Sequence, residues 1–509
     1  MMIKVILLVI FFAVMVAVGI YSRKHAMSVD GFVLGGRSVG PWLTAFAYGT
    51  SYFSAVVFVG YAGQFGWKYG LASTWIGIGN AVIGSLMAWV VLGRRTKVMT
   101  QYLNSKTMPD FFGSRYGSKP LKIAASAIVF VFLVPYTASI YNGLSRLFEM
   151  AFHIPYAWCV IGMAVFTGIY VILGGYMATA INDFIQGIIM LVGIIVVIAA
   201  VLNGQGGFLE AVGKMAEIPS DVEITLGQPG AFTSFFGPDP GNLLGVVILT
   251  SLGTWGLPQM IGKFYAIKDE KSINTGTVIS TVFAIVVSGG CYFLGGFARL
   301  FDAPAIYDEA GAVVYDSIIP HMLSALPDIL IGIVVVLVLS ASMSTLASLV
   351  LTSSSTLTLD FLKDNLLKEM SEKRQVRTMQ VLVIFFIAVS VFIALDPPTF
   401  IAQLMGISWG ALAGAFLAPF LYGLYWKGTT RAGLWASFIV GVGITVVNMF
   451  MPFIESSINA GAAAMLAGLI VVPVVSLITP KLSREKTDAI FSCYEEKVTI
   501  TKKRSLEQN

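Results

Sequence analysis

Apolar segments of about 20 residues recur along the whole chain and leave little sequence for a water-soluble core. A segment of that length crosses about 30 Å of hydrocarbon as an α-helix, which satisfies its own backbone hydrogen bonds in lipid. With 57% hydrophobic and 12% charged residues, the sequence predicts an all-α polytopic membrane protein. We count thirteen predicted transmembrane helices, at residues 3–21, 41–66, 71–93, 122–148, 156–175, 183–202, 242–262, 274–298, 328–355, 378–395, 399–425, 432–452 and 460–479.

The basic residues predict the orientation of these spans. The first span is too long for a cleavable signal, and its basic flank, Arg23 and Lys24, follows it, which places the N-terminus outside. If thirteen spans alternate from there, the cytoplasmic segments receive most of the 32 Lys and Arg residues. We therefore expect a multi-pass protein of the plasma (inner) membrane with a cytoplasmic C-terminus. The exceptions are Lys4, Lys68, Arg146, Lys214 and Arg299.

Two of the predicted spans contain patches that would interrupt a helix in mid-membrane. Residues 47–55 are mostly small or polar, and residues 253–259 contain two glycines and Pro258. One such interruption alone could be an ordinary kink, but two, five helices apart, predict inverted repeats with a binding site between them. The repeats would comprise spans 2–6 and 7–11, about residues 41–202 and 242–426. Both lie in a single transmembrane domain, 1–480, followed by a cytoplasmic tail, 481–509.

The uncharged run from 329 to 350 carries a hydroxyl pair in Ala341-Ser342-Met343-Ser344-Thr345. Ala341, Ser344 and Thr345 are spaced i, i+3, i+4 and share one helix face. One carbonyl and two hydroxyls directed at one point suit a small hard cation, which prefers oxygen ligands. The alternative is that both hydroxyls bond back to carbonyls of the preceding turn. The sequence pattern leaves both interpretations open.

Several motifs together resemble those of the sodium:solute symporters, which include proline, pantothenate, sugar and monocarboxylate carriers. The resemblance rests on residues 174–178 with 182–187, on 341–345 with 353–355, and on 258–268. It implies a sodium ion, co-transported with the solute, where the broken second span meets the ninth. The implied ligands are backbone carbonyls of Thr50, Phe53 and Ala341 and side-chain oxygens of Ser344 and Thr345.

Proton coupling is the competing mechanism and normally requires an ionisable group within the membrane. We find none in the central part of spans 2–11, and we expect Lys263, just beyond the end of span seven, to anchor at the interface. Sodium therefore fits better than protons.

The solute site should lie in the same midplane cavity, next to the interrupted helices. Tyr52 stands where the proline carriers have an Asp, whereas residues 50–55 look more like the pantothenate carrier. No Arg lies deep in the predicted cavity to hold a carboxylate. The start of span six is an ordinary place for Asp183 as a helix cap, but its place in the family motif implies a role at the inner gate. For gating we therefore select Pro258 and Asp183. The substrate-binding candidates are Ser51, Tyr52, Ser54, Val57, Tyr136, Ser139, Thr254 and Trp255.

These features predict a sodium-coupled symporter that imports a small organic solute by alternating access. The solute would be an organic carboxylate, such as pantothenate or a monocarboxylate, or an amino acid. The alternatives are a proline or sugar symporter of the same family and a transporter-like receptor. An enzyme is not expected, because reactive groups are missing from the predicted cavity. The expected partners are the solute, sodium and the lipid bilayer. The net charge of +5 carries no argument for nucleic acid, and the oligomeric state is not predicted.

Overall fold

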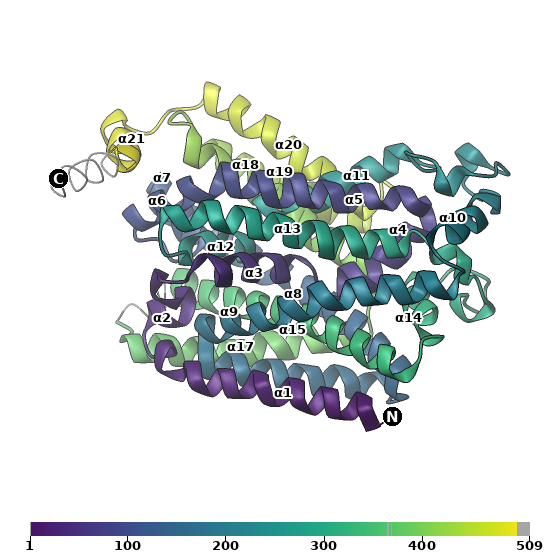
Figure 1. The fold of residues 1–509 in the computed structure, drawn as a ribbon. Coiled ribbons are helices and arrows are strands. Elements are labelled where there is room, and N and C mark those ends of the chain that lie inside the picture. Colours follow the sequence, from purple (N-terminus) through teal and green to yellow (C-terminus); the bar gives the residue numbers. More distant parts are fainter. Residues whose placement is uncertain (1, 364–365, 368, 496–509) are drawn as a thin grey trace, which may run out of the picture.

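The computed structural model describes residues 2–363, 366–367 and 369–495 as long helices that lie side by side (Figure 1). Within this part of the chain there is no β-strand, and the only extended pairings are two isolated bridges. The first half contains α1 (Met2–Ser22), η1 (Arg23–Ala26), α2 (Val29–Leu34), η2 (Gly35–Arg37), α3 (Pro41–Tyr52), η3 (Val56–Tyr61), α4 (Ala62–Tyr69), η4 (Gly70–Ser73), α5 (Thr74–Gly79), η5 (Asn80–Met87), η6 (Trp89–Gly93), α6 (Arg94–Tyr102), α7 (Met108–Tyr116), α8 (Lys119–Phe152), α9 (Tyr156–Gly204), α10 (Phe208–Glu217), η7 (Glu223–Thr225) and η8 (Ala231–Thr233).

The second half continues with the same architecture. It contains α11 (Pro240–Leu252), η9 (Gly253–Trp255), α12 (Pro258–Ala266), α13 (Glu270–Gly295), η10 (Ala298–Phe301), η11 (Pro304–Ile306), α14 (Tyr315–Ser324), α15 (Asp328–Thr356), η12 (Leu357–Leu362), α17 (Glu372–Leu395), α18 (Ile401–Tyr425), α19 (Arg431–Phe450), α20 (Ser457–Ile478) and α21 (Arg484–Phe491). Of the predicted tail, residues 496–509 lie outside the described residues.

Eleven helices in the described residues are long and apolar enough to cross a membrane. The polytopic, all-helical fold predicted from the sequence is therefore confirmed. Two of the eleven are too long for one crossing: residues 56–102 and 156–204 cover 47 and 49 residues. Residues 156–204 contain two of the predicted spans, and residues 56–102 contain the end of one predicted span and the whole of the next. The number thirteen stays a prediction.

Both of these long segments turn back at a glycine. Gly70 has φ 60° and ψ −141°, and Gly175 has φ 53° and ψ −149°, a conformation that a residue with a Cβ rarely adopts. In α9, Tyr170 packs against Gly19, whereas Gln186 contacts Met15 only one turn away on α1. Sixteen residues of straight helix would separate Tyr170 and Gln186 by about 24 Å. The two parts of α9 therefore lie beside the same stretch of α1, as two neighbouring spans would.

The predicted interruptions are present in the structure. Helix α3 ends at Tyr52, and Phe53 takes an extended conformation with φ −110° and ψ 103° before η3 begins at Val56. Likewise, α11 passes into the short turn η9, and Leu257 is extended before Pro258 starts α12. An extended residue within the bundle releases backbone carbonyls from the helical pattern, which is tolerated in a membrane only where protein or a cavity lines it.

Two helices form the centre of the bundle. Helix α15 packs against α9, α8, α1 and α17, and α18 packs against α20, α19 and α8. The interrupted helix α3 contacts α9, α13 and α15. In Figure 1 one end of the bundle carries α2, α6, α7 and α21, and the opposite end carries α10 and α14. We call the first the basic end, because α6 and the segments around α2 and α7 contribute many of its Lys and Arg residues.

Candidate functional site

The break in α3 brings backbone oxygens against the face of α15 that carries the hydroxyl pair. The Ser344 hydroxyl lies 3.0 Å from the Thr50 carbonyl oxygen and 3.1 Å from that of Ala341. The Thr345 hydroxyl lies 3.0 Å from each of the same two carbonyl oxygens. All four residues are buried. Four of the five oxygens that the family resemblance implies for a sodium site therefore meet at one point between two helices.

The fifth predicted ligand, Phe53, lies at the break itself. Its N–H donates to the Gly49 carbonyl at 3.2 Å and ends α3, while its own carbonyl lies in the extended segment. The bonds from Ser344 and Thr345 to Ala341 show that the local alternative, bonding back within the helix, also occurs here. It occurs together with the contact to Thr50, so the hydroxyls are shared between two helices.

This group of oxygens carries no formal charge, and all of its members are hard ligands of the kind that alkali and alkaline-earth cations prefer. Among the described residues no cluster of three or more His, Cys, Asp or Glu side chains could hold a metal ion. Four neutral oxygens at one point therefore suit a monovalent hard cation, which needs no carboxylate ligand.

Aromatic side chains gather next to this site, on the side away from the basic end. Tyr52 stacks on Phe53 with ring centroids 4.2 Å apart and on Trp409 of α18 at 6.0 Å. Trp409 meets Tyr136 of α8 edge to face at 5.9 Å. The phenol of Tyr61 in η3 lies close enough to those of Tyr52 and Tyr136 to interact electrostatically. We call these five residues the aromatic cluster.

Polar atoms in the aromatic cluster are buried with few partners outside the cluster. The Tyr61 hydroxyl makes no hydrogen bond in the described part of the chain. The Tyr136 hydroxyl faces Ser54 and the Trp409 indole, without a hydrogen bond of good geometry to either. Leaving a buried donor unpaired costs about 1 to 3 kcal/mol. Three donors without well-formed hydrogen bonds in one cluster form a place where a ligand with hydrogen-bond acceptors would supply the missing partners.

Other predicted solute residues have their polar groups directed at the protein itself. Tyr52 donates to the Thr250 carbonyl at 2.5 Å, and the Trp255 indole donates to the Ile83 carbonyl at 3.0 Å. Thr254 donates to the carbonyls of Gly84 and Ser251. These bonds join α3 to α11 and η9 to η5 in this conformation.

The remaining candidates lie in three different environments. Ser139 donates to the Tyr136 carbonyl at 2.7 Å, and Ser54 accepts from the Val56 N–H at 3.2 Å. Val57 is buried in η3. Ser51 points to α15, where its hydroxyl lies 2.8 Å from that of Ser348. Ser51 is thus directed away from the aromatic cluster.

Lys263 contradicts the expectation of an interfacial anchor. It is only 3% exposed, donates to the Ser348 hydroxyl at 2.9 Å and lies 3.8 Å from the Asp183 carboxylate. The ammonium also lies 5.2 Å from the centre of the Tyr176 ring. Sequence analysis misplaced Lys263 because it falls one residue beyond the predicted span 242–262. A buried ion pair therefore lies inside the bundle, linked through Ser348 to Ser51, the neighbour of Thr50.

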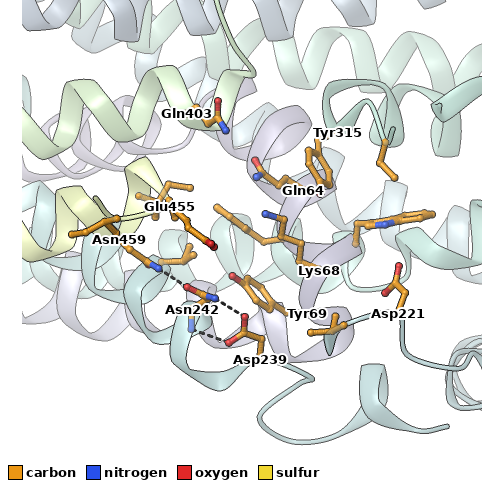
Figure 2. Close-up of a pocket in the computed structure, with 18 of the residues that line it drawn as sticks. Gln64, Lys68, Tyr69, Asp221, Asp239, Asn242, Tyr315, Gln403, Glu455 and Asn459 are labelled. Atoms are coloured by element: carbon orange, nitrogen blue, oxygen red, sulfur yellow. Dashed lines mark hydrogen bonds between the residues drawn. The ribbon is translucent and has the colours of Figure 1, made fainter. Parts of the chain in front are cut away.

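A cavity of about 670 Å³ opens at the end opposite the basic end (Figure 2). Its lining includes Gln64, three residues beyond Tyr61, and Gln403, six residues before Trp409. Figure 2 shows Asn242 bonded to both Asp239 and Asn459 along one side of this cavity. The cavity is therefore lined by polar groups from α18, which also carries Trp409, and from α4, which directly follows η3 and its Tyr61.

On the other side of the site, toward the basic end, the corresponding cavity is small. It has a volume of about 40 Å³ and is lined by Pro258, Lys263 and Ser348, among others. Thr107, another lining residue, donates to the buried Asp360 carboxylate at 2.5 Å. The predicted gating residue Pro258 thus lines this narrow space, and Asp183 lies beside it through its ion pair with Lys263.

Comparison with known sequences gives one consistent result. A family model described as the sodium:solute symporter family matches residues 32–441. Sodium/proline symporters of Staphylococcus aureus strains JH9 and NCTC 8325 / PS 47 are each 30% identical to this chain over 500 residues. The match covers 94% of this chain and 93% of each relative.

Comparison with solved structures supports the fold. A substrate-bound, outward-open Na⁺-coupled sialic acid symporter gives a TM-score of 0.76 at 14% identity, over 95% of this chain and 99% of that one. Mhp1, a nucleobase-cation-symport-1 family transporter in a closed conformation with bromovinylhydantoin bound, gives 0.52 at 13% identity, over 91% and 98%. At these identities the likeness shows the fold alone.

Proposed function

Because the chain belongs to the sodium:solute symporter family, we propose that it imports a small organic solute together with sodium by alternating access. It is a membrane transporter rather than an enzyme, and sodium is its co-transported ion. The observation that carries the proposal is the meeting of Thr50, Ala341, Ser344 and Thr345 oxygens at the break in α3.

Sodium binds at this break, held by the carbonyls of Thr50, Phe53 and Ala341 and the hydroxyls of Ser344 and Thr345. When the ion arrives, the two hydroxyls turn their lone pairs to it and give up their bonds to the carbonyls. The carbonyls then face the ion as well. Neutral ligands replace the hydration shell without a buried carboxylate, so the ion can also leave.

One sodium ion supplies enough free energy for concentrative uptake. A membrane potential of about 100 mV contributes roughly 2.3 kcal/mol per charge, and a tenfold sodium gradient adds about 1.4 kcal/mol. Together they support roughly 500-fold accumulation of a neutral solute per sodium ion.

The buried pair of Lys263 and Asp183 connects the sodium site to the exit toward the basic end. Ser51 follows Thr50 directly, and its hydroxyl contacts that of Ser348, which accepts from Lys263. Movement of α3 when sodium leaves therefore disturbs the Lys263 environment and the walls of the small cavity next to Pro258. In this role Lys263 and Asp183 are positioning residues of the inner gate.

The solute binds at the aromatic cluster, between the large cavity and the sodium site. The unbonded hydroxyl of Tyr61 and the poorly bonded donors of Tyr136 and Trp409 suit a solute with acceptor oxygens, and the aromatic faces suit an apolar body. We therefore place an organic carboxylate first, such as pantothenate or a monocarboxylate, or an amino acid. Proline itself is the second candidate, favoured by the 30% identity to sodium/proline symporters, although Tyr52 replaces the Asp of the proline carriers.

The same proposal includes the orientation. The basic end faces the cytoplasm of a plasma (inner) membrane and the N-terminus lies outside, following the distribution of Lys and Arg. The large cavity then opens outward and the small one is the closed inner route. The repeats, 41–202 and 242–426, would move relative to each other to exchange these states.

Uptake into proteoliposomes tests the proposal. An inward sodium gradient should drive accumulation of at least one radiolabelled solute from a panel of pantothenate, short monocarboxylates, proline and other amino acids, and sugars. Equal influx with choline in place of sodium would contradict the coupling, and transport of sugars alone would contradict the solute class. Accumulation of proline alone would select the second candidate.

A matched pair of variants tests the solute site. Tyr136→Phe removes a hydroxyl of the aromatic cluster that has no hydrogen bond of good geometry, and it should raise the KM for the solute about tenfold. Tyr116→Phe removes an equally buried hydroxyl that is bonded to the Pro419 carbonyl near the basic end, and it should leave that KM unchanged. The same KM in both variants would contradict the assignment of the aromatic cluster.

A further inference from the structure

Four cationic side chains surround a cavity at the basic end, far along the chain from the residues of the transport site. Arg23 of η1 and Lys373, Arg374 and Arg377 of α17 line a space of about 800 Å³. No Asp or Glu is among the lining residues, and Glu372, the neighbour of Lys373 on α17, is not one of them. In the described residues, 2–363, 366–367 and 369–495, no Asp or Glu carboxylate lies within 4.0 Å of the charged group of any of these four cations.

An apolar groove continues from this cavity along the bundle. The groove has a volume of about 520 Å³ and is lined by side chains of α9 and α17, including Val165, Ile384 and Ala388. Ile172 and Leu173 line both the cavity and the groove, so the two spaces are contiguous. The groove faces the outside of the bundle, where the lipid tails of a membrane lie.

A hydrogen bond between the two helices fixes the junction of cavity and groove. The Gln380 amide donates to the Ile172 carbonyl at 3.0 Å, three residues before α9 turns at Gly175. Gln380 and Ile172 also line the basic cavity. The junction is therefore a defined feature of the α9 and α17 pair, with cations on one side of it and aliphatic side chains on the other.

We infer that this is a binding site for one anionic phospholipid. Its phosphate lies among Arg23, Lys373, Arg374 and Arg377, and an acyl chain occupies the groove between α9 and α17. Basic pockets between transmembrane helices at a membrane surface suit such headgroups, and each Lys or Arg near an anionic lipid strengthens binding about fivefold. A soluble phosphate would use the cations but not the groove, whereas a zwitterionic lipid would use the groove with little gain from the cations.

Native mass spectrometry of the full chain in detergent tests this inference without any knowledge of the solute. Wild type should bind dioleoyl phosphatidylglycerol at least tenfold more tightly than dioleoyl phosphatidylcholine. The triple variant Lys373→Gln/Arg374→Gln/Arg377→Gln should lose about 100-fold in affinity for phosphatidylglycerol. The matched triple variant Lys481→Gln/Arg484→Gln/Lys486→Gln removes three cations of the C-terminal segment that do not line the cavity, and it should stay within threefold of wild type.

A second comparison distinguishes a lipid from its headgroup. Ala388→Trp fills the groove at an exposed position and keeps every cation. It should weaken phosphatidylglycerol binding at least fivefold, and free glycerol 3-phosphate should not displace the lipid at equal concentration. Equal affinity for the two lipids, equal loss in the two triple variants, or displacement by glycerol 3-phosphate would each overturn the inference.

Discussion

The buried pair of Lys263 and Asp183 gives a prediction whose size follows from the geometry. The two side chains are 3% and 1% exposed, and the Asp183 oxygens make no hydrogen bond in the described residues. Replacing Lys263 by Met therefore leaves the Asp183 carboxylate as a buried charge whose ammonium partner is gone. Removing one partner of a buried ion pair costs about 3 to 5 kcal/mol, whereas replacing both by neutral groups of similar size is often close to neutral.

The corresponding experiment is a double-mutant cycle. Unfolding free energies in mixed detergent micelles are measured for wild type, Lys263→Met, Asp183→Asn and the double variant. Each single variant should lose about 3 to 5 kcal/mol, and the double variant should lose less than either. The resulting interaction energy should be at least about 2 kcal/mol.

An exposed ion pair serves as the control for this cycle. Lys427 and Asp488 lie 2.6 Å apart, but their side chains are 55% and 61% exposed. The same cycle with Lys427→Met and Asp488→Asn should give an interaction energy below about 1 kcal/mol, because water screens exposed charges. If the losses of Lys263→Met and Asp183→Asn simply add, the two buried charges do not interact and the proposed link to the inner gate fails.

Three further predictions concern α14, the aromatic cluster and the small cavity. Burial raises the pKa of Asp316 in α14, outside the spanning helices, to about 6. The folded protein therefore binds this proton more tightly than the unfolded chain does, and its free energy of unfolding falls by up to about 3 kcal/mol as pH rises from 4 through 6. Asp316→Asn should make the unfolding temperature depend less on pH between pH 4.5 and 7.5. Trp409→Phe should raise the KM for the solute about tenfold with unchanged half-maximal sodium, and an equal rise in both would contradict its role. We expect the hydrogen bond from Thr107 to Asp360 to help hold the inner route closed. Thr107→Val removes this bond and should increase the alkylation rate of a cysteine introduced by Thr352→Cys in the small cavity about tenfold. An unchanged alkylation rate would show that this bond does not hold the inner route closed.

The helical architecture was predictable from the sequence because the bilayer imposes one length and one polarity on every span. The interruptions at Phe53 and Leu257 were predictable for a related reason. Small, polar or proline residues in mid-membrane interrupt the helix, and the backbone groups they release cost free energy unless protein or a cavity provides partners. The reversals at Gly70 and Gly175 fix where one span ends and the next begins. A hydropathy profile does not contain those backbone angles.

The site was only partly predictable. Ala341, Ser344 and Thr345 could be grouped because helical spacing places them on one face, and Thr50 was added through the family resemblance. Lys263 was missed because span ends cannot be located to a single residue from hydropathy. A shift of one residue in the predicted end of span 242–262 decides whether Lys263 is expected at the interface or inside the bundle.

The same limit applies to residues that meet only through tertiary packing. The unbonded hydroxyl of Tyr61 and the poorly bonded indole of Trp409 gave no signal, because an aromatic residue in an apolar span is usually part of the packing. Their significance depends on which hydrogen bonds the surrounding helices leave unmade. That information exists only in the folded arrangement of η3, α8 and α18.

The central claim is that sodium is held by neutral oxygens where α3 meets α15, and equilibrium binding of radioactive sodium to the purified protein tests it most directly. Ser344→Ala/Thr345→Val removes both hydroxyl ligands and keeps the approximate side-chain volumes. It should weaken sodium binding at least 30-fold, since each bond to a charged partner contributes about 1.5 to 3 kcal/mol. The matched variant Ser342→Ala removes a neighbouring hydroxyl that bonds to the Val338 carbonyl within α15, and it should bind sodium like wild type. Sodium affinity that is equal in the double variant and in wild type would contradict the account.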